Sequence, residues 1–337
     1  MKKWILWSLL VLLVVGITIA AYFYSVLFGN AFEGKREVRV RIRSGWNLDK
    51  LADVLQEKAA MKNKERFVYW VNRLGYKKVK PCTIKIPAGC SMYQLADILK
   101  KNRYQTTNIT ILGSMDKLKL ATLLANKLEM DADSFVQLLS KPGNILNTGF
   151  TDTTWQALFV ANTYNFAVAT NTEGFMRRMV TEHRKFWNDE RMKRAAGQGL
   201  TPLQVVIVAS IVTKESNKTD EYENIAGVYL NRLRKGMLLQ ADPTVVYVRN
   251  HTGRVTGADL KIESPYNTYL HEGLPPGPIC IPNISSMEAV LNYSGHHFLY
   301  FVAMPDFSGY HHFSATLAEH NLWARKFHQA LNQRNIR

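Results

Sequence analysis

Glu215 is the residue whose type and position most clearly predict chemistry. It follows an apolar run, 205–212, in a segment that begins with Thr201, Pro202 and Gln204. These three residues form a helix-start signal: an N-cap, a proline at the first helical position and a capping-box partner. A carboxylate on the apolar face of such a helix loses hydration, which raises its pKa and lets it hold a proton near neutral pH. The pattern therefore predicts a general acid, although a glutamate just beyond the buried turns could equally be an ordinary solvated residue.

The segments after Glu215 supply polar groups in rigid loops. We expect a second amphipathic helix over 220–234, which Gly236 ends, then a polar turn over 239–244 and a strand over 245–248. Two loops rich in Pro, Gly, Asn and Tyr follow at 264–269 and 272–278. Amides and hydroxyls pair with sugar hydroxyls, and aromatic rings cover the apolar faces of sugars. The loops therefore favour a carbohydrate ligand, while an ordinary loop-rich surface is the simpler interpretation.

Four segments in this order carry a resemblance to a known family: "ASIVTKES", "IAGVYLNRLRKGMLLQADPTVVY", "SPYNTYLHEGLPPGPICIPN" and "HHFSATLAEHN". They closely resemble the endolytic murein transglycosylases of the YceG-like (MltG) family, over roughly residues 199–325. The resemblance places Glu215 at the family's catalytic glutamate and implies neither a cofactor nor a metal. It also implies cleft or supporting positions for seven residues within the motifs: Asn231, Gln240, Asp242, Ser264, Tyr266, Asn267 and Glu272.

Two positions depart from the pattern of the family. Many members carry a segment like Leu-Glu-Gly-x-Leu-Phe-Pro-Asp-Thr-Tyr, and this chain has Gln156 and Asn162 where that segment has its two acids. Two acids are thus replaced by amides. It is therefore in doubt that acids at these two positions are essential in this chain. The amides could still keep the shape and the hydrogen bonding of the acids that they replace.

The N-terminus predicts an uncleaved membrane anchor. Residues 4–28 carry no charge, and a helix of that length spans ~37 Å at ~1.5 Å per residue, enough for a hydrocarbon core of ~30 Å. Residues 1–3 form a basic tip that is expected in the cytoplasm, although basic residues just beyond the span weaken this orientation. We therefore expect a single-pass protein of the bacterial cytoplasmic membrane, with its catalytic domain on the extracytoplasmic side and the lipid bilayer as a partner through 4–28.

The charge of the chain agrees with an envelope protein. The formal net charge is +16, and residues 33–103 hold 18 basic and 7 acidic residues. Behind a membrane anchor this excess fits anionic lipid or cell-wall polymer better than nucleic acid, which we do not expect as a partner. The chain has three cysteines, Cys82, Cys90 and Cys280, whose spacing is not that of metal ligands. Two of them could form one disulfide. The paired histidines at 296–297 and 311–312 are poor chelates, because adjacent strand residues point to opposite faces.

An internal repeat occupies the basic region. Residues 40–55 and 84–99 each read as a short strand, a Gly turn and an amphipathic helix, 44 residues apart. The two units resemble the LysM-like module of the family and could bind glycan or serve as a spacer. We expect an α+β fold, with a LysM-like module at 33–112, a mainly helical connection at 113–198 and a catalytic domain at 199–337.

The resemblance implies a lyase that cuts peptidoglycan between N-acetylmuramic acid and N-acetylglucosamine and leaves 1,6-anhydro ends. Two alternatives stay open. Asp242 and Glu272 could provide a hydrolase with its second carboxylate, and a decayed catalytic domain would leave a wall-binding scaffold. Peptidoglycan synthases are implied as partners only through the family.

Overall fold

The computed structural model describes residues 2–101, 106–141, 143, 145–249, 251, 253–293 and 295–334. These residues form two compact units with an α+β composition, as predicted. The first unit comprises Met1–Asn108, Lys127–Glu129 and Asn165–Asn171, and the second comprises Ile109–Asn126, Met130–Tyr164 and Thr172–Arg337. The predicted boundary at residue 199 therefore lies within the second unit.

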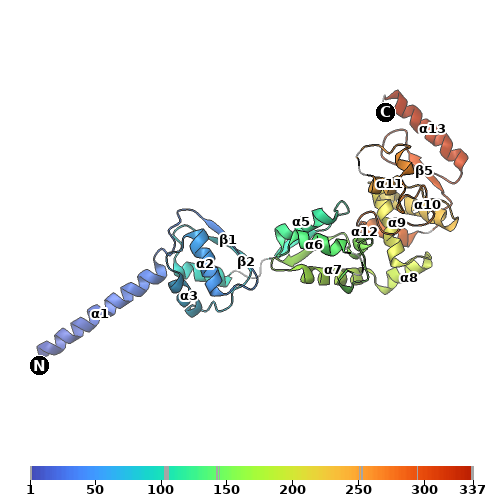
Figure 1. Cartoon of the computed structure of the whole chain (residues 1–337). Coiled ribbons are helices and arrows are strands. Elements are labelled where there is room, and N and C mark those ends of the chain that lie inside the picture. Colours follow the sequence, from blue (N-terminus) through green and yellow to red (C-terminus); the bar gives the residue numbers. More distant parts are fainter. Residues whose placement is uncertain are drawn as a thin grey trace. The chain divides into compact units, whose positions relative to one another are not determined.

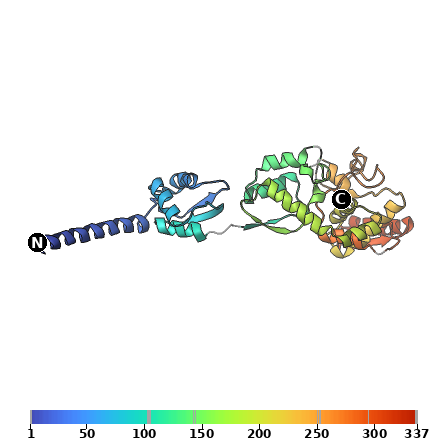
Figure 2. The same ribbon diagram turned by 90° about the horizontal axis from the view of Figure 1, so that it is seen from below.

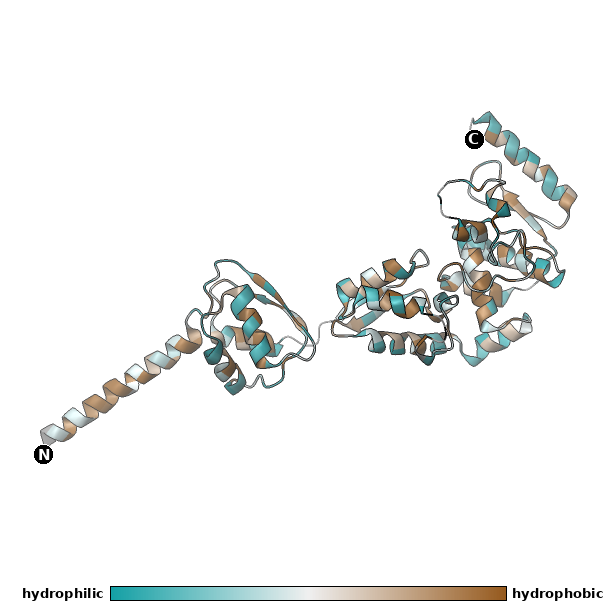
Figure 3. Cartoon of the chain, viewed as in Figure 1, coloured by the Kyte–Doolittle hydropathy of each residue, from teal (hydrophilic) through white to brown (hydrophobic). Residues whose placement is uncertain are grey.

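The first unit begins with a long apolar helix, α1 (Lys2–Phe28), which runs unbroken in both views (Figures 1 and 2). Its stretch Trp4–Phe28 is long and apolar enough to cross a membrane, and apolar residues follow most of its length in Figure 3. This helix is compatible with a single-pass anchor.

Aromatic contacts join the end of α1 to the rest of the first unit. The ring of Phe23 meets Trp70 edge-on at 5.7 Å between centroids, and Phe28 lies 5.2 Å from Tyr93. Trp70 belongs to α3 (Lys64–Arg73), and Tyr93 belongs to α4 (Met92–Lys101). The apolar helix thus packs directly on the folded module.

The predicted repeat is confirmed at the level of its elements. Strand β1 (Val38–Ile42) leads into α2 (Leu48–Ala59), and β2 (Cys82–Ile86) leads into α4. The turns contain Gly45 and Gly89, whose φ angles of 78° and 71° favour glycine. The strands pair antiparallel, Val40 opposite Ile84, and turn their alternate apolar side chains into one core. In this core, Cys82 and Cys90 are buried free thiols, as is Cys280 in the second unit.

The second unit contains most of the helices. Its helices are α5 (Lys117–Lys127), α6 (Ala132–Ser140), α7 (Thr172–Phe186), α8 (Asp189–Gly197), α9 (Pro202–Glu215), α10 (Tyr222–Arg234), α11 (Asp242–Val248), α12 (Ile284–Asn292) and α13 (Leu317–Gln333). Within it, strand β5 (Tyr300–Ala303) pairs antiparallel with β6 (His311–Ser314). Strand β3 (Thr106–Thr110) pairs with β4 (Thr163–Ala167), and the residues of both strands are divided between the two units.

Helix α9 forms the centre of this unit and begins as predicted. Thr201 accepts a hydrogen bond from the Gln204 backbone N–H at 3.3 Å, and the Gln204 side chain accepts one from the Thr201 N–H at 2.8 Å. The eight residues 205–212 are all buried, and α9 packs against both α10 and α12. Burial on every side fixes the direction of the helix, and with it the position of its last residue, Glu215.

The predicted strand at 245–248 is wrong, because these residues belong to α11. The apolar β-branched run favours a strand locally. However, Asp242 and Pro243 start a helix, and the Thr244 hydroxyl donates to the Ala241 carbonyl at 2.7 Å, within the buried first turn. The predicted helix over 220–234 is confirmed as α10.

Candidate active site

A small polar pocket of about 260 Å³ surrounds the end of α9. Side chains from α9, α10, α11, β5, α13 and the loops at 239–240 and 269 converge on it. They are Glu215, Tyr229, Arg232, Leu239, Gln240, Asp242, Tyr269, Phe301 and His320.

Glu215 holds a proton near neutral pH in this environment. Burial raises the pKa of its carboxyl group from 4.5 to about 7, and the negative charge of Asp242 adds to the rise. The Tyr229 hydroxyl, which donates to Glu215 Oε1, and the charge of Arg232 act in the opposite direction. Since burial is the largest cause, the carboxyl group is poised between its acid and base forms.

Two residues of α10 reach the pocket from one face of the helix, because they are three positions apart. Tyr229 is almost fully buried, and Glu215 is the acceptor of its hydroxyl. Arg232 donates from Nε to the Leu299 carbonyl at 2.7 Å and from Nη1 to the Leu239 carbonyl at 2.8 Å. These neutral acceptors fix the guanidinium in place without neutralising it, so its charge acts on the pocket.

Asp242 provides a second carboxylate beside Glu215. Its Oδ1 accepts a hydrogen bond from the Tyr269 hydroxyl at 2.6 Å. Gln240 precedes it with a φ of 51° and donates from its backbone N–H to the Thr268 carbonyl at 3.0 Å. The turn before α11 is therefore held in one conformation, with Asp242 and Gln240 exposed at the pocket.

His320 and Phe301 complete the pocket from the C-terminal part of the chain. The His320 ring stacks on Tyr300 at 5.3 Å, and Arg232 lies 5.2 Å from the centre of the same Tyr300 ring. Burial, and then the charge of Arg232, lower the pKa of His320. This imidazole is therefore neutral at pH 7 and can donate or accept a hydrogen bond.

The YceG-like family profile matches residues 40–326, most of the chain. This chain belongs to the YceG-like family. An endolytic murein transglycosylase of Bacillus subtilis (strain 168) is 27% identical over 319 residues, which cover 90% of this chain and 88% of that protein. An endolytic murein transglycosylase of Streptococcus pneumoniae (strain D39) is 37% identical over 112 residues, 32% of this chain and 20% of that protein. A crystal structure of a YceG-like protein from Listeria monocytogenes aligns with a TM-score of 0.56 and 26% identity, covering 86% of this chain and 99% of the other.

Within this YceG-like chain, the pocket contains three of the residues predicted from sequence: Glu215, Gln240 and Asp242. The other predicted residues lie outside its lining. Asn231 is the clearest of these, because its amide donates to the carbonyls of His296 at 2.8 Å and Phe298 at 3.0 Å. It fastens residues 295–298 to α10.

The 264–272 loop contains the other four predicted residues. Asn267 is fully buried and donates to the Leu260 and Ile262 carbonyls, while its Oδ1 accepts from the Tyr269 N–H at 3.0 Å. It therefore orients Tyr269, which does reach the pocket. Ser264 and Tyr266 shape the turn before it: the Ser264 carbonyl accepts from the Asn267 N–H at 2.8 Å, and the Tyr266 ring packs on Tyr247 at 4.9 Å. Glu272 is exposed.

Sequence reasoning did not select six residues of this pocket: Tyr229, Arg232, Leu239, Tyr269, Phe301 and His320. A signal existed for two of them. Tyr229 and Arg232 interrupt the apolar face of the helix at 220–234 with polar atoms, at a spacing that brings them together. His320 and Phe301 reach the site through tertiary packing alone.

No group of three or more His, Cys, Asp or Glu side chains suited to a metal ion occurs among the described residues. In β6, His311 pairs instead with Glu221, at 3.0 Å between Nδ1 and Oε2.

Proposed function

We propose that this protein is a lytic transglycosylase that cleaves peptidoglycan strands internally, with Glu215 as its acid and base. The observation that carries this proposal is the position of Glu215 in a polar pocket, where burial raises its pKa to about 7 and the Tyr229 hydroxyl donates to one of its oxygens. Membership of a family whose relatives are named endolytic murein transglycosylases supports the substrate.

In the proposed mechanism, Glu215 donates its proton to the glycosidic oxygen as the bond to the anomeric carbon breaks. The positive charge that develops on the sugar resembles an oxocarbenium ion. The Glu215 carboxylate then accepts the proton of the C6 hydroxyl, whose oxygen attacks the anomeric carbon and closes the 1,6-anhydro ring. Glu215 ends protonated, and the internal nucleophile removes the need for water or a second carboxylate.

The surrounding residues have defined tasks in this scheme. Tyr229 holds the Glu215 carboxyl group in one orientation, and its hydroxyl stabilises the carboxylate after proton transfer. Gln240, Asp242, Tyr269 and His320 line the space where the two sugar rings would bind, with amide, carboxylate, phenol and imidazole groups. Asn231, Ser264, Tyr266 and Asn267 support the loops, and Glu272 is left as a substrate contact at the rim.

A hydrolase remains the second candidate because Asp242 is a carboxylate in the same pocket as Glu215. A hydrolase of this bond uses its second carboxylate to activate water or to attack carbon. The hydroxyl of Tyr269 donates to Asp242 Oδ1 and holds this carboxylate in one orientation. The two reactions differ in their products: anhydro ends for the lyase and reducing ends for the hydrolase.

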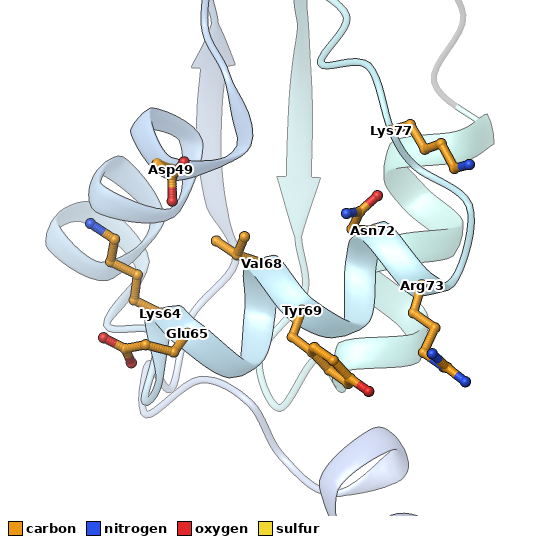
Figure 4. A pocket seen from close by; sticks show the side chains of 8 residues that line it. All are labelled: Asp49, Lys64, Glu65, Val68, Tyr69, Asn72, Arg73 and Lys77. Carbon is orange, nitrogen blue, oxygen red and sulfur yellow. The ribbon is translucent and has the colours of Figure 1, made fainter.

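We further propose the arrangement in the envelope: a cytoplasmic tip at 1–3, a span at 4–28 in the cytoplasmic membrane, and a LysM-like module at 33–112. A connection at 113–198 and the catalytic domain at 199–337 would follow on the extracytoplasmic side. A groove of about 730 Å³ on the module supports glycan binding there. In Figure 4, α3 directs Tyr69 and Asn72 to this groove, with Asp49 from α2 and Lys77 beyond α3. Peptidoglycan synthases would be the partners of an enzyme that cuts nascent strands.

The test is mass spectrometry of the fragments that the full chain, in detergent, releases from purified peptidoglycan. We expect 1,6-anhydro ends from the wild type and none from Glu215→Gln. Reducing ends would establish the hydrolase, and intact strands with both proteins would leave a wall-binding scaffold.

A further inference from the structure

A second cavity of about 470 Å³ lies in the second unit, near the end of α11, whereas the start of α11 lines the Glu215 pocket. The beginning of α5, the 3-10 turn at Trp155–Leu158, the end of α9 and the end of α11 enclose it. Its polar lining includes Lys117, Gln156, Lys214 and Tyr247. The mechanism above uses none of these residues.

Gln156 leaves one hydrogen-bonding position unfilled. Its side chain is 4% exposed, and no described residue donates to its Oε1. Its Nε2 has the Tyr247 hydroxyl at 3.5 Å, the limit of a hydrogen bond. A buried amide oxygen without a donor is destabilising, so this group favours a ligand that brings an N–H or O–H.

The two lysines of the cavity carry charge that the cavity does not neutralise. Lys117 Nζ donates to the neutral Ser140 hydroxyl at 3.3 Å. Burial lowers the pKa of Lys117, and the negative charge of Asp152 acts in the opposite direction. Lys214 is exposed and forms no ion pair within the part of the chain that the structure describes. The carboxylate in the lining, Asp116, already accepts from the Lys119 N–H at 2.7 Å and pairs with the Lys119 amine at 3.6 Å. A bound anion would therefore balance the positive charge of these two lysines.

The remaining lining is apolar and suits small aliphatic groups. Trp155 and Met115 line the cavity together with Ile279. A ligand that fits combines a carboxylate, an amide N–H and short hydrophobic side chains. A peptide that contains alanine and a free carboxylate has all three.

Two elements connect this cavity to the Glu215 pocket. Lys214 immediately precedes Glu215 at the end of α9. Asp242 and Tyr247 lie five residues apart in α11, which is a rise of roughly 7.5 Å along the helix. A chain bound at Glu215 could therefore extend a substituent into the cavity.

We propose that this cavity binds the carboxylate-bearing stem peptide of the peptidoglycan strand. The assignment rests on the proposed function for the identity of the strand. The sugar rings of a peptide-substituted strand carry no charge, because the lactyl carboxyl group of muramic acid is bound as an amide. The anionic groups therefore belong to the peptide, and the two lysines distinguish it from the sugars.

Binding of a free peptide tests this assignment without cleavage. The protein is the full chain in detergent with Glu215→Gln, and the ligand is L-Ala-γ-D-Glu-L-Lys-D-Ala, measured by calorimetry. We expect binding that weakens about tenfold when Lys117→Met and Lys214→Met are combined, as it does when the peptide carboxylates are amidated. Lys193→Met, an exposed lysine of α8, is the matched control and should leave the affinity unchanged.

The outcomes separate this assignment from the proposed reaction. The stem-peptide site is overturned if the peptide does not bind, or if it binds equally well with and without the two lysine substitutions. This holds even if the enzyme produces anhydro ends. Conversely, lysine-dependent peptide binding by a protein that releases no anhydro ends supports the site and rejects the reaction. With Glu215 intact, the chain that carries Lys117→Met and Lys214→Met should also cleave peptide-free strands at the wild-type rate, and a loss of that rate contradicts a role confined to the peptide.

Discussion

The Glu215 pocket and the Gln156 cavity lie at the two ends of α11 and differ in how their polar and charged groups are partnered. In the Glu215 pocket, each carboxylate accepts from a phenol, and Arg232 donates to backbone carbonyls. Among the described residues of this pocket, the buried atom without a partner is His320 Nδ1. In the cavity, Gln156 Oε1 has no donor and Lys214 forms no ion pair among the described residues. Carboxylates held by donors suit the proposed reaction, whereas an unpaired lysine suits the proposed binding of an anion.

The largest expected effect is loss of cleavage in Glu215→Gln. General acid–base catalysis contributes about 10²–10⁴-fold, and in the proposed mechanism one residue performs both steps, so we expect a decrease of at least about 10³-fold. Anhydro-ended fragments measured over time provide the rate. Retained activity would contradict the catalytic role of Glu215 and make Asp242 the candidate catalytic residue.

The same substitution should stabilise the fold, increasingly so as the pH rises. The folded-state pKa of Glu215 is about 7 against 4.5 as its ordinary value, so the unfolded chain loses this proton first. The stability that the protonated group contributes is complete below pH 4.5 and is lost as the pH rises through 7. The difference in unfolding free energy reaches at most about 3 kcal/mol above pH 7. Melting temperatures of both proteins between pH 4 and 8 measure it, and parallel curves would contradict a raised pKa.

Tyr229→Phe should lower the cleavage rate about tenfold, because Glu215 loses the donor that orients it. The alkaline limb of the pH–rate profile should move to higher pH, since this hydrogen bond lowers the pKa of Glu215. Tyr269→Phe is the matched control, because its hydroxyl serves Asp242 instead. An equal shift of the alkaline limb in both variants would show that Tyr229 has no specific effect on Glu215.

Asp242→Asn should have a smaller effect, a decrease of a few-fold at pH 7. Its charge raises the pKa of Glu215, so the alkaline limb should move to lower pH, opposite to Tyr229→Phe. Complete loss of cleavage at every pH would favour the hydrolase.

The smallest effect is expected at the other end of α11. Gln156→Glu places a carboxylate in a cavity with two lysines, where it should compete with the stem peptide and weaken its binding about threefold. The pH–rate profile on peptide-free strands should stay unchanged. A shift in that profile would show that the two regions are coupled.

Local sequence signals predicted the elements that contain the site more fully than the site itself. The capping box at Thr201 and the burial of 205–212 follow from residues close in sequence, and both are confirmed. The strand expected at 245–248 failed because Asp242 and Pro243 impose a helix start on a β-branched run. Helix α11 places Asp242 and Tyr247 at its two ends, so this error also hid the link between the two regions.

Side chains that arrive from distant segments could not be predicted. His320 reaches the pocket because α13 packs on β5. Asn231 instead donates hydrogen bonds to the carbonyls of His296 and Phe298, outside the pocket. Both lie in family-like segments, where spacing along the chain does not distinguish a ligand contact from a structural hydrogen bond. The amide at Gln156 stood out in the sequence, but its unfilled acceptor becomes visible only in three dimensions.

The aromatic contacts at the end of α1 have a mechanical consequence. As the proposed membrane span, the uncharged stretch Trp4–Phe28 is longer than a bilayer core of ~30 Å, which would cover about 20 of its residues. The end of this stretch packs on the folded module, because Phe23 contacts Trp70 and Phe28 contacts Tyr93. A helix usually adapts to a thinner membrane by tilting. Here the first unit would tilt with it, so the thickness of the membrane would set the angle at which this module faces the wall.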